Sequence, residues 1–172
     1  MQEPAMTATL TVIDISIDRQ RQETDSETTI FSALRFENGV AVDRFYECVN
    51  GAVLSDDPSD FSGNTDEQIR NTGTIMEDAY WQLIEFCDGS EIVSSHSNSD
   101  VRALKRICQE YSLPVPHQHI TNLDAIFRLR FHEGYSSRIA EKHLDITTVE
   151  TGDWRDLDIA GKAYLELLKD GM

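Results

Sequence analysis

The first fifty residues alternate apolar and polar side chains, which is the pattern of strands with one buried face. The alternation predicts a strand at residues 8–16, a polar turn at 18–27, a second strand at about 28–36 and a third at 40–49. Between the last two stands Asn38-Gly39, a pair that tolerates positive φ. The chain is therefore predicted to open with three strands, and the second and third should form a hairpin.

Beyond this region, apolar side chains mostly recur every three or four positions, as in a helix with one buried face. The predicted elements are a loop at 50–64, a helix from 75, a strand at 91–94, a helix between the turn 95–99 and Pro114, helices at about 123–132 and 136–143, and a last helix at about 154–169. A further short strand is allowed before the last three helices. This order predicts a mixed α/β fold in a single domain, 1–172, with its core at about 8–170.

The composition supports one core and restricts the partners. With 172 residues and 40% apolar side chains, the chain can bury one substantial core. Its formal charge of -16 repels polyanions, which excludes a broad basic footprint for nucleic acid. Any nucleic-acid contact must be local, through arginines and metal ions. The acidity also suits a solvated surface, a salt-adapted source or a basic protein partner.

Cysteine usage and the absence of long apolar runs predict a cytoplasmic protein. Cys48, Cys87 and Cys108 have spacings that fit neither a disulfide framework nor a metal knuckle. The N-terminal residues lack a basic stretch followed by an apolar one, and no apolar run approaches the roughly 20 residues that span a bilayer. We therefore expect no membrane segment.

Three aspartates stand at the ends or beginnings of predicted elements. Asp14 ends the first apolar strand, Asp100 follows the strand at 91–94, and Asp158 lies in the last helix. A carboxylate at the end of a buried strand is costly without a partner, which favours a site role for Asp14. Simpler interpretations stay open for the others, because Asp100 could cap a helix and Asp158 could be a solvated helix residue.

These aspartates carry a resemblance to a known family. The strand ending in Asp14-Ile-Ser16, the small-residue turn before Asp100, and the C-terminal segment from Asp153 to Asp158 resemble the three motifs of the DEDD (DEDDh-type) 3′→5′ exonucleases. The resemblance covers about residues 8–170. It implies a ribonuclease H-like fold, in which helices flank a mixed central sheet whose first three strands are antiparallel.

The resemblance also implies a chemistry based on metal ions. In this family two Mg²⁺ or Mn²⁺ ions, about 4 Å apart, hold the attacking water and neutralise the leaving oxygen within a cage of carboxylates. By the resemblance, Asp14, Asp100 and Asp158 would be the metal ligands, with Asp14 bridging both ions. A homodimer is a further state that the resemblance allows.

The chain departs from the family pattern at three positions. Ser16 stands where the first motif has a glutamate, and a neutral hydroxyl is a poor ligand for a hard dication. Asp153 stands where the third motif has the histidine base, and its reference pKa of about 3.9 makes it a weaker base. Ser62, in the segment 61–69, replaces the histidine of a His-Gly-Ile-Thr stretch.

Two hypotheses follow. In the first, catalysis is reduced or lost, and the protein binds single-stranded nucleic acid 3′ ends or a basic protein partner. In the alternative, it is an active Mg²⁺- or Mn²⁺-dependent exonuclease on single-stranded RNA or DNA with a rearranged carboxylate set, Asp14, Asp100, Asp153 and Asp158. Asp153 could reach the centre only from the loop before the last helix, because five residues within one helix separate two side chains by about 140°. Alternatively, Asp153 caps that helix.

Other candidates are weaker. Asp18 and Asp156 could join the carboxylates, and His96 could contact a phosphate, although an exposed loop histidine is the simpler interpretation. His117 and His119 have a metal-binding spacing but no third ligand nearby in sequence, which favours a surface loop. The candidate phosphate contacts are Arg102, Arg106, Arg128, Arg130 and Arg138.

Overall fold

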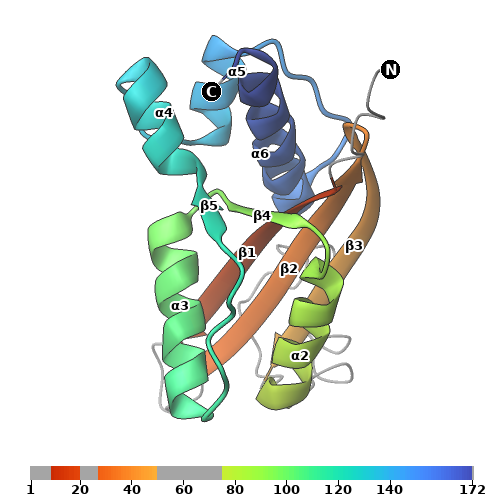
Figure 1. Ribbon diagram of the computed structural model, residues 1–172, viewed down its shortest axis with the longest axis vertical. Coiled ribbons are helices and arrows are strands. Elements are labelled where there is room, and N and C mark those ends of the chain that lie inside the picture. The colour runs from red at the N-terminus through yellow and green to blue at the C-terminus, as the bar shows by residue number, and fades with distance from the viewer. Residues whose placement is uncertain (1–8, 20–26, 50–74, 172) are drawn as a thin grey trace, which may run out of the picture.

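The computed structural model describes residues 9–19, 27–49 and 75–171 (Figure 1). The elements are β1 (Thr9–Arg19), β2 (Glu27–Glu37), β3 (Val40–Val49), α2 (Met76–Cys87), β4 (Glu91–Ser94), α3 (Ser97–Glu110), β5 (Ile120–Asn122), α4 (Leu123–Phe131), α5 (Ser137–His143) and α6 (Gly152–Lys169). The predicted strands and helices are confirmed within a few residues, and β5 is the additional short strand. The predicted loop at 50–64 and the segment 61–69 lie outside the described residues.

The strands form one mixed sheet with the order β3-β2-β1-β4-β5. The pairs β1–β2 and β2–β3 are antiparallel, whereas β1–β4 and β4–β5 are parallel. The hairpin between β2 and β3 turns at Asn38 and Gly39, with φ of 52° and 82°. The predicted fold class, α/β with an antiparallel start and flanking helices, is confirmed.

The predicted polar turn at 18–27 is partly wrong. β1 continues to Arg19 and β2 begins at Glu27, and these two residues pair in the antiparallel ladder. The ladder joins backbone groups, so it can continue where the side chains no longer alternate between apolar and polar. The apolar pattern therefore located the strands but underestimated their length.

Alternate side chains of the central strands pack into two separate hydrophobic clusters. Ile13 and Ile15 of β1 pack with α2 and α3, whereas Leu10 and Val12 pack with α4, α5 and α6. In Figure 1, α2 and α3 lie in front of the strands, and α4, α5 and α6 gather at the upper end. Because side chains alternate along a strand, Asp14 belongs to the same face as Val12, the face covered by α6.

α6 packs very closely on this face. A Cβ atom added at Gly161 would lie 2.3 Å from Cε2 of Phe36 in β2, so only glycine permits this approach. The helix begins at Gly152, whose φ is +60°, rather than at 154 as predicted. Asp153 therefore lies in the first turn of α6 rather than in the loop from which it was expected to reach the centre. The alternative that it caps the helix is wrong, because the N-cap residue is Thr151.

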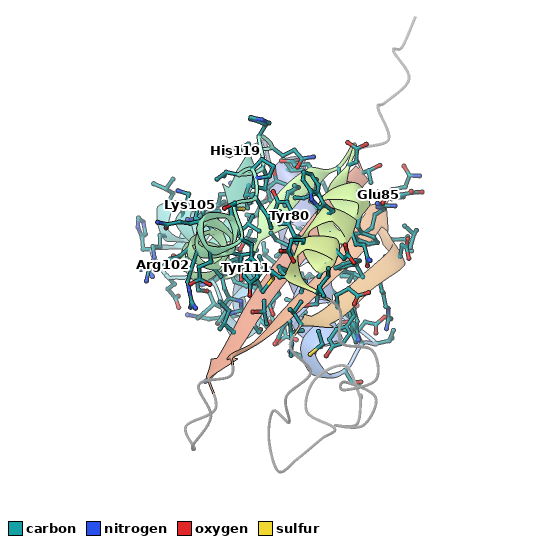
Figure 2. All side chains as sticks on the ribbon, turned by 90° about the horizontal axis from the view of Figure 1, so that it is seen from below. Tyr80, Glu85, Arg102, Lys105, Tyr111 and His119 are labelled. Atoms are coloured by element: carbon teal, nitrogen blue, oxygen red, sulfur yellow. The ribbon has the colours of Figure 1, made fainter. Side chains whose placement is uncertain are left out.

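α2 and α3 cover the other face. Tyr80 of α2 is buried, and its hydroxyl donates a hydrogen bond to the carbonyl oxygen of Pro114, beyond the end of α3. Figure 2 shows Tyr80 and Tyr111 on the sides of α2 and α3 that face each other, and Arg102 and Lys105 on the outer side of α3. Among the described helices, none has the length and apolar composition needed to cross a membrane.

Candidate functional site

The parallel pairing of β1 and β4 places Asp14 beside the beginning of α3. Ile13 pairs with Ser94, the last residue of β4, and Asp14 follows directly. Asp14 lies in the middle of β1, but it comes directly after the last residue that β1 pairs with β4, so the residues that follow β4 lie close to it. The Asp14 side chain is 21% exposed, so its carboxylate is within reach of solvent.

Asp100 is held firmly in the first turn of α3. Its side chain is 1% exposed; Oδ1 accepts a hydrogen bond of 3.0 Å from the Ile15 amide, and Oδ2 accepts one from the Ser94 hydroxyl. Asp100 does not cap the helix, because the N-cap residue is His96. Burial and the nearby Asp14 charge raise the pKa of Asp100 to about 7, against the opposing effect of the two hydrogen bonds.

His96 lies between the two aspartates. Its carbonyl oxygen accepts a hydrogen bond of 2.9 Å from the Asp100 amide, which is one of the first hydrogen bonds of α3. Its Nδ1 lies 3.6 Å from Asp14 Oδ1 and 3.1 Å from the Ser95 hydroxyl oxygen. The Asp14 carboxylate is the main cause of a raised His96 pKa, and the charges of Asp100 and Asp156 add to it.

Asp14, His96 and Asp100 form a group of potential metal ligands. Within the described part of the chain, they offer ligand atoms that all lie within 4.8 Å of one another. Their donor types fit a divalent cation, since two carboxylates supply negative charge and an imidazole supplies a neutral nitrogen. His96 is an exposed residue of the turn before α3, as the simpler interpretation held, and it also lies beside Asp14. The sequence places His96 four residues before Asp100, in the turn after β4, but gives no sign of its approach to Asp14.

Asp158 is buried but has a different partner. Its side chain lies on α6, is 2% exposed, and has Oδ2 at 2.7 Å from the ammonium nitrogen of Lys162, one helical turn away. Lys162 also donates a hydrogen bond of 2.8 Å to the carbonyl oxygen of Thr147. The interpretation of Asp158 as a solvated residue is wrong. The structure thus brings Asp14 and Asp100 together with His96, and it places Asp158 in an ion pair with lysine.

Of the three positions that depart from the family pattern, Ser62 lies outside the described residues and the other two differ in their surroundings. The Ser16 hydroxyl donates a hydrogen bond of 3.1 Å to Asp14 Oδ2, so it binds the neighbouring carboxylate. The side chain of Asp153 lies outside the described atoms, and its role stays a prediction. Asp156, also on α6, accepts a hydrogen bond of 2.6 Å from the Ser137 hydroxyl.

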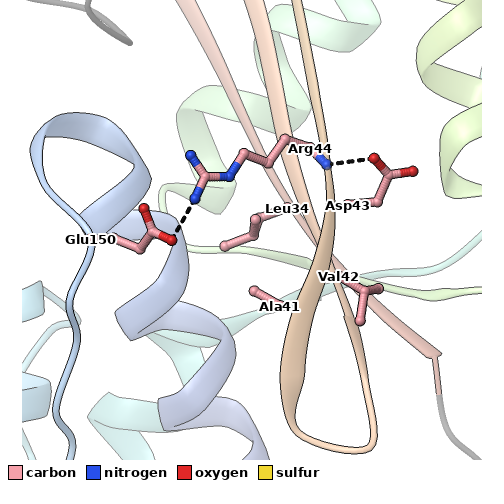
Figure 3. Close-up of a pocket in the computed structure, with 6 residues that line it drawn as sticks. All are labelled: Leu34, Ala41, Val42, Asp43, Arg44 and Glu150. Carbon is pink, nitrogen blue, oxygen red and sulfur yellow. Dashed lines mark hydrogen bonds and ion pairs between the residues drawn. The ribbon is translucent and has the colours of Figure 1, made fainter.

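A pocket lies between β3 and the start of α6. It has a volume of about 330 Å³ and is lined by Leu34, Ala41, Val42, Asp43, Arg44 and Glu150 (Figure 3). The Arg44 guanidinium forms an ion pair with Glu150 and lies 5.1 Å from the ring centroid of Trp154. These contacts hold both sides of the first turn of α6, although none of the predicted site residues lines the pocket.

Several of the predicted phosphate contacts are engaged with carboxylates on the surface. Arg106 pairs with Glu110, Arg128 with Asp124, and Arg130 with Asp170, at 2.7 to 2.9 Å. Exposed pairs of this kind are worth about 1 kcal/mol or less, so a phosphate could displace them. These ion pairs therefore do not decide whether the arginines contact nucleic acid.

The fold and the arrangement of aspartates define a protein with a DEDD exonuclease-like, ribonuclease H-like fold. Similar solved structures include the nuclease domain of 3′hExo, a DEDDh family member, bound to rAMP, with a TM-score of 0.72, 14% identity, and coverage of 98% of this chain and 96% of that one. A structure described as 3′-end specific recognition of histone mRNA stem-loop by 3′-exonuclease has a TM-score of 0.70, with 15% identity and coverage of 98% and 84%.

A third similar structure is product-bound exonuclease I, with a TM-score of 0.63, 13% identity, and coverage of 96% of this chain but 44% of that one. No family model and no curated protein sequence matches the chain. At these identities the comparisons establish the fold, and the chemistry must be argued from the side chains of this chain.

Proposed function

We propose that this protein is an exonuclease-fold module that binds the 3′ end of single-stranded nucleic acid and whose phosphodiester hydrolysis is reduced or lost. The observation that carries the proposal is the ion pair between Asp158 and Lys162. In the family pattern an aspartate at this position holds a cation, and here a lysine ammonium stands within 2.7 Å of the carboxylate. A divalent ion at Asp158 would have to displace that ammonium.

The substitution at Ser16 supports the same conclusion. A glutamate there would add a negative charge beside Asp14, whereas the serine hydroxyl donates to Asp14 Oδ2. Two dications in one site require several carboxylates to neutralise them. Position 16 has a neutral hydroxyl, and the charge of Asp158 is balanced by Lys162. Compared with the family pattern, the site therefore has two negative charges fewer to offer a cation. When bound, a divalent ion would polarise a phosphate oxygen and lower the pKa of a water molecule.

Binding of a nucleic-acid end is supported by the fold and by the group of Asp14, His96 and Asp100. Similar structures are described as bound to rAMP and as recognising an RNA 3′ end. A cation held by two aspartates would attract a phosphate, which the protein with a charge of -16 would otherwise repel. Binding through such a bridge depends on the cation, unlike binding through a basic surface.

The test is to incubate chelator-treated protein with 3′-tailed single-stranded RNA and DNA, with Mg²⁺, with Mn²⁺ or with EDTA. Fluorescence anisotropy measures binding, and gel electrophoresis measures shortening. We expect binding that requires a divalent ion, is weakened by Asp14→Asn, and is accompanied by little or no shortening. A substrate with a blocked 3′ end is the matched control for end recognition.

Other outcomes separate the alternatives. Equal binding in EDTA and in Mn²⁺ would contradict a cation-bridged site. Rapid stepwise shortening that disappears in Asp14→Asn would overturn the loss of catalysis and would favour the second candidate function, an active exonuclease with a rearranged carboxylate set that includes Asp153. The observation that favours this second candidate is the group of Asp14, His96 and Asp100, whose potential ligand atoms all lie within 4.8 Å of one another.

Absence of any nucleic-acid binding would direct attention to protein partners. The strongly acidic composition would then favour a basic protein, and a homodimer is the other assembly to examine. Pull-down with a basic peptide library and light scattering of the pure protein distinguish these two.

A further inference from the structure

The ligand group combines donors of two different types from three segments. Asp14 comes from β1, His96 from the junction after β4, and Asp100 from the first turn of α3. Asp100 and His96 are linked by the hydrogen bond from the Asp100 amide to the His96 carbonyl oxygen. Asp100 is anchored to β1 by its bond from the Ile15 amide. The backbone therefore fixes the relative positions of all three residues.

The distances fit donors that share one ion. His96 Nδ1 and Asp14 Oδ1 are 3.6 Å apart, beyond the range of a good hydrogen bond. Two donors at about 2.1 Å from one ion lie roughly 3 to 3.6 Å apart when they are adjacent in a tetrahedral or octahedral shell. Small rotations of exposed side chains complete the geometry, since His96 is 60% exposed and Asp14 is 21% exposed.

The carboxylates of Asp14 and Asp100 can still accept a cation. Within the described residues, neither Asp14 nor Asp100 has a lysine or arginine as an ion-pair partner. The Asp100 oxygens each accept one hydrogen bond and keep a further lone pair for a cation. Since Asp158 is paired with Lys162, the chain offers one such set of ligands rather than the symmetrical cage that two ions require.

The nitrogen donor changes the preferred metal. Mg²⁺ prefers an all-oxygen octahedral shell and dehydrates reluctantly, so an imidazole adds little to its binding. Mn²⁺, Co²⁺ and Zn²⁺ accept imidazole nitrogen, with affinities that generally rise in the order Mn²⁺, Co²⁺, Zn²⁺ among these three. Histidine in place of a carboxylate is therefore expected to shift the site towards these ions.

We propose that Asp14, His96 and Asp100 form a single-ion site that selects Mn²⁺, Co²⁺ or Zn²⁺ over Mg²⁺, with His96 as a direct ligand. This inference rests on the proposed function, because it specifies the cation that bridges the module to a nucleic-acid end. It adds that one ion is bound. It also adds that the choice of ion depends on His96, which is not one of the three motif aspartates.

The test measures metal binding directly, without reference to activity. Chelator-treated protein is titrated with Mg²⁺, Mn²⁺, Co²⁺ and Zn²⁺ in a calorimeter, and the visible absorption of bound Co²⁺ reports nitrogen ligation. We expect one ion per chain. His96→Ala should raise the Kd for Co²⁺ and Zn²⁺ at least about tenfold, and the Kd for Mg²⁺ by less than about threefold. His119→Ala is the matched control and should leave the titrations unchanged, because His119 is exposed and belongs to no group of potential metal ligands among the described residues.

Each contrary result has a defined meaning. Unchanged Co²⁺ and Zn²⁺ affinity in His96→Ala, or two ions per chain in the unmodified protein, would overturn the proposal. Anisotropy with a 3′-tailed oligonucleotide in the same samples separates this failure from failure of the proposed function. If the oligonucleotide binds equally with every ion in both proteins, the single-ion site is wrong and end binding stands. If it binds with none while Co²⁺ binds through His96, end binding is wrong and the metal site stands.

Discussion

Two regions that carry predicted site residues, here called the first and second walls, satisfy their carboxylates in different ways. On the wall formed by β1, β4 and α3, Asp14 and Asp100 lie with His96 in a group whose ligand atoms are within 4.8 Å of one another. On the wall formed by α6, Asp158 is paired with Lys162 of its own helix at 2.7 Å. Among the described residues the aspartates of the first wall have no lysine or arginine partner, whereas the aspartate of the second wall is paired with a lysine of its own helix.

The proposed loss of hydrolysis rests on this difference between the two walls. A buried carboxylate must have a partner, and either a metal ion or a lysine can serve. A lysine gives a site that is stable without metal but holds one cation fewer. The first wall still needs its cation, or a proton, to offset the proximity of Asp14 and Asp100.

Restoring the residues of the family pattern should produce the largest effect. In the double variant Ser16→Glu, Asp153→His, a glutamate would add a ligand beside Asp14 and a histidine would supply a general base. A positioned base alone contributes typically about 100-fold to 10,000-fold. We therefore expect the rate of 3′-end shortening with Mn²⁺ to rise at least about 100-fold over the unmodified protein, measured by single-turnover gel assay.

The control for this gain is the triple variant that also carries Asp14→Asn, in which the new activity should disappear. If the double variant folds, binds Mn²⁺ and still fails to shorten the substrate, then the neutralised α6 wall, rather than the two missing residues, limits catalysis. Adding Lys162→Ala to the double variant would then be the next comparison.

The raised pKa of Asp100, on the first wall, should make the free energy of unfolding depend on pH. Burial and the Asp14 charge raise the pKa of Asp100 to about 7 in the folded protein, from about 4 in the unfolded chain. Between these values the folded state keeps a proton that the unfolded state has lost, so the contribution of Asp100 to stability falls as the pH rises from about 4 to 7. A shift of about three pH units corresponds to roughly 2 to 4 kcal/mol.

Urea unfolding in EDTA at pH 4.5, 6 and 8 measures this loss, with Asp100→Asn as the comparison. Asparagine keeps the acceptor for the Ile15 amide but cannot ionise. We expect Asp100→Asn to gain stability relative to the unmodified protein as the pH rises, with the gain levelling off above pH 7. Parallel pH profiles for the two proteins would show that Asp100 ionises normally, and the charge on this wall would have to be reassigned.

The ion pair on the second wall can be broken from the lysine side. In Lys162→Met the Asp158 carboxylate, 2% exposed, loses its cation. Fully buried pairs cost about 3 to 5 kcal/mol when one partner is removed; because Lys162 is 33% exposed, we expect about 2 kcal/mol. Urea unfolding in EDTA measures it, and Lys162→Met, Asp158→Asn should recover most of the loss.

The same variant sharpens the comparison when metal is added. If Lys162 replaces a cation, Mn²⁺ should raise the melting temperature of Lys162→Met more than that of the unmodified protein. An equal rise in both would mean that Asp158 stays out of reach of the ion, and the lysine would then be only a helix-stabilising partner.

The sequence predicted the fold better than the site because the two depend on different distances along the chain. Alternation, the Asn38-Gly39 turn and the helical spacing are local, and they located the strands and helices of the sheet correctly. The meeting of His96 with Asp14 depends on the parallel pairing of β1 with β4, which joins segments about eighty residues apart. A single histidine in a serine-rich turn gave no local sign of that pairing.

The α6 wall shows a different reason for incomplete prediction. The spacing of Asp158 and Lys162, four residues apart, is visible in the sequence, but an (i, i+4) pair is usually an exposed contact of small value. Its importance comes from the burial of Asp158, which is 2% exposed and which the spacing alone does not indicate. The last helix was predicted from about residue 154, which left Asp153 just before it, yet α6 begins at Gly152.

The smallest expected effect concerns Ser16, which the structure places on the first wall as a hydrogen-bond donor to Asp14. Ser16→Ala removes a partly buried bond of 3.1 Å and should lower the free energy of unfolding by about 0.5 to 1 kcal/mol. Ser137→Ala removes a comparable bond to the exposed Asp156 and should cost less. If Ser16 is only a donor, Mn²⁺ affinity in Ser16→Ala should change less than about threefold, because the carboxylates and His96 hold the ion. A loss of ten-fold or more, measured by calorimetry, would make the Ser16 hydroxyl a ligand and extend the cation site along β1.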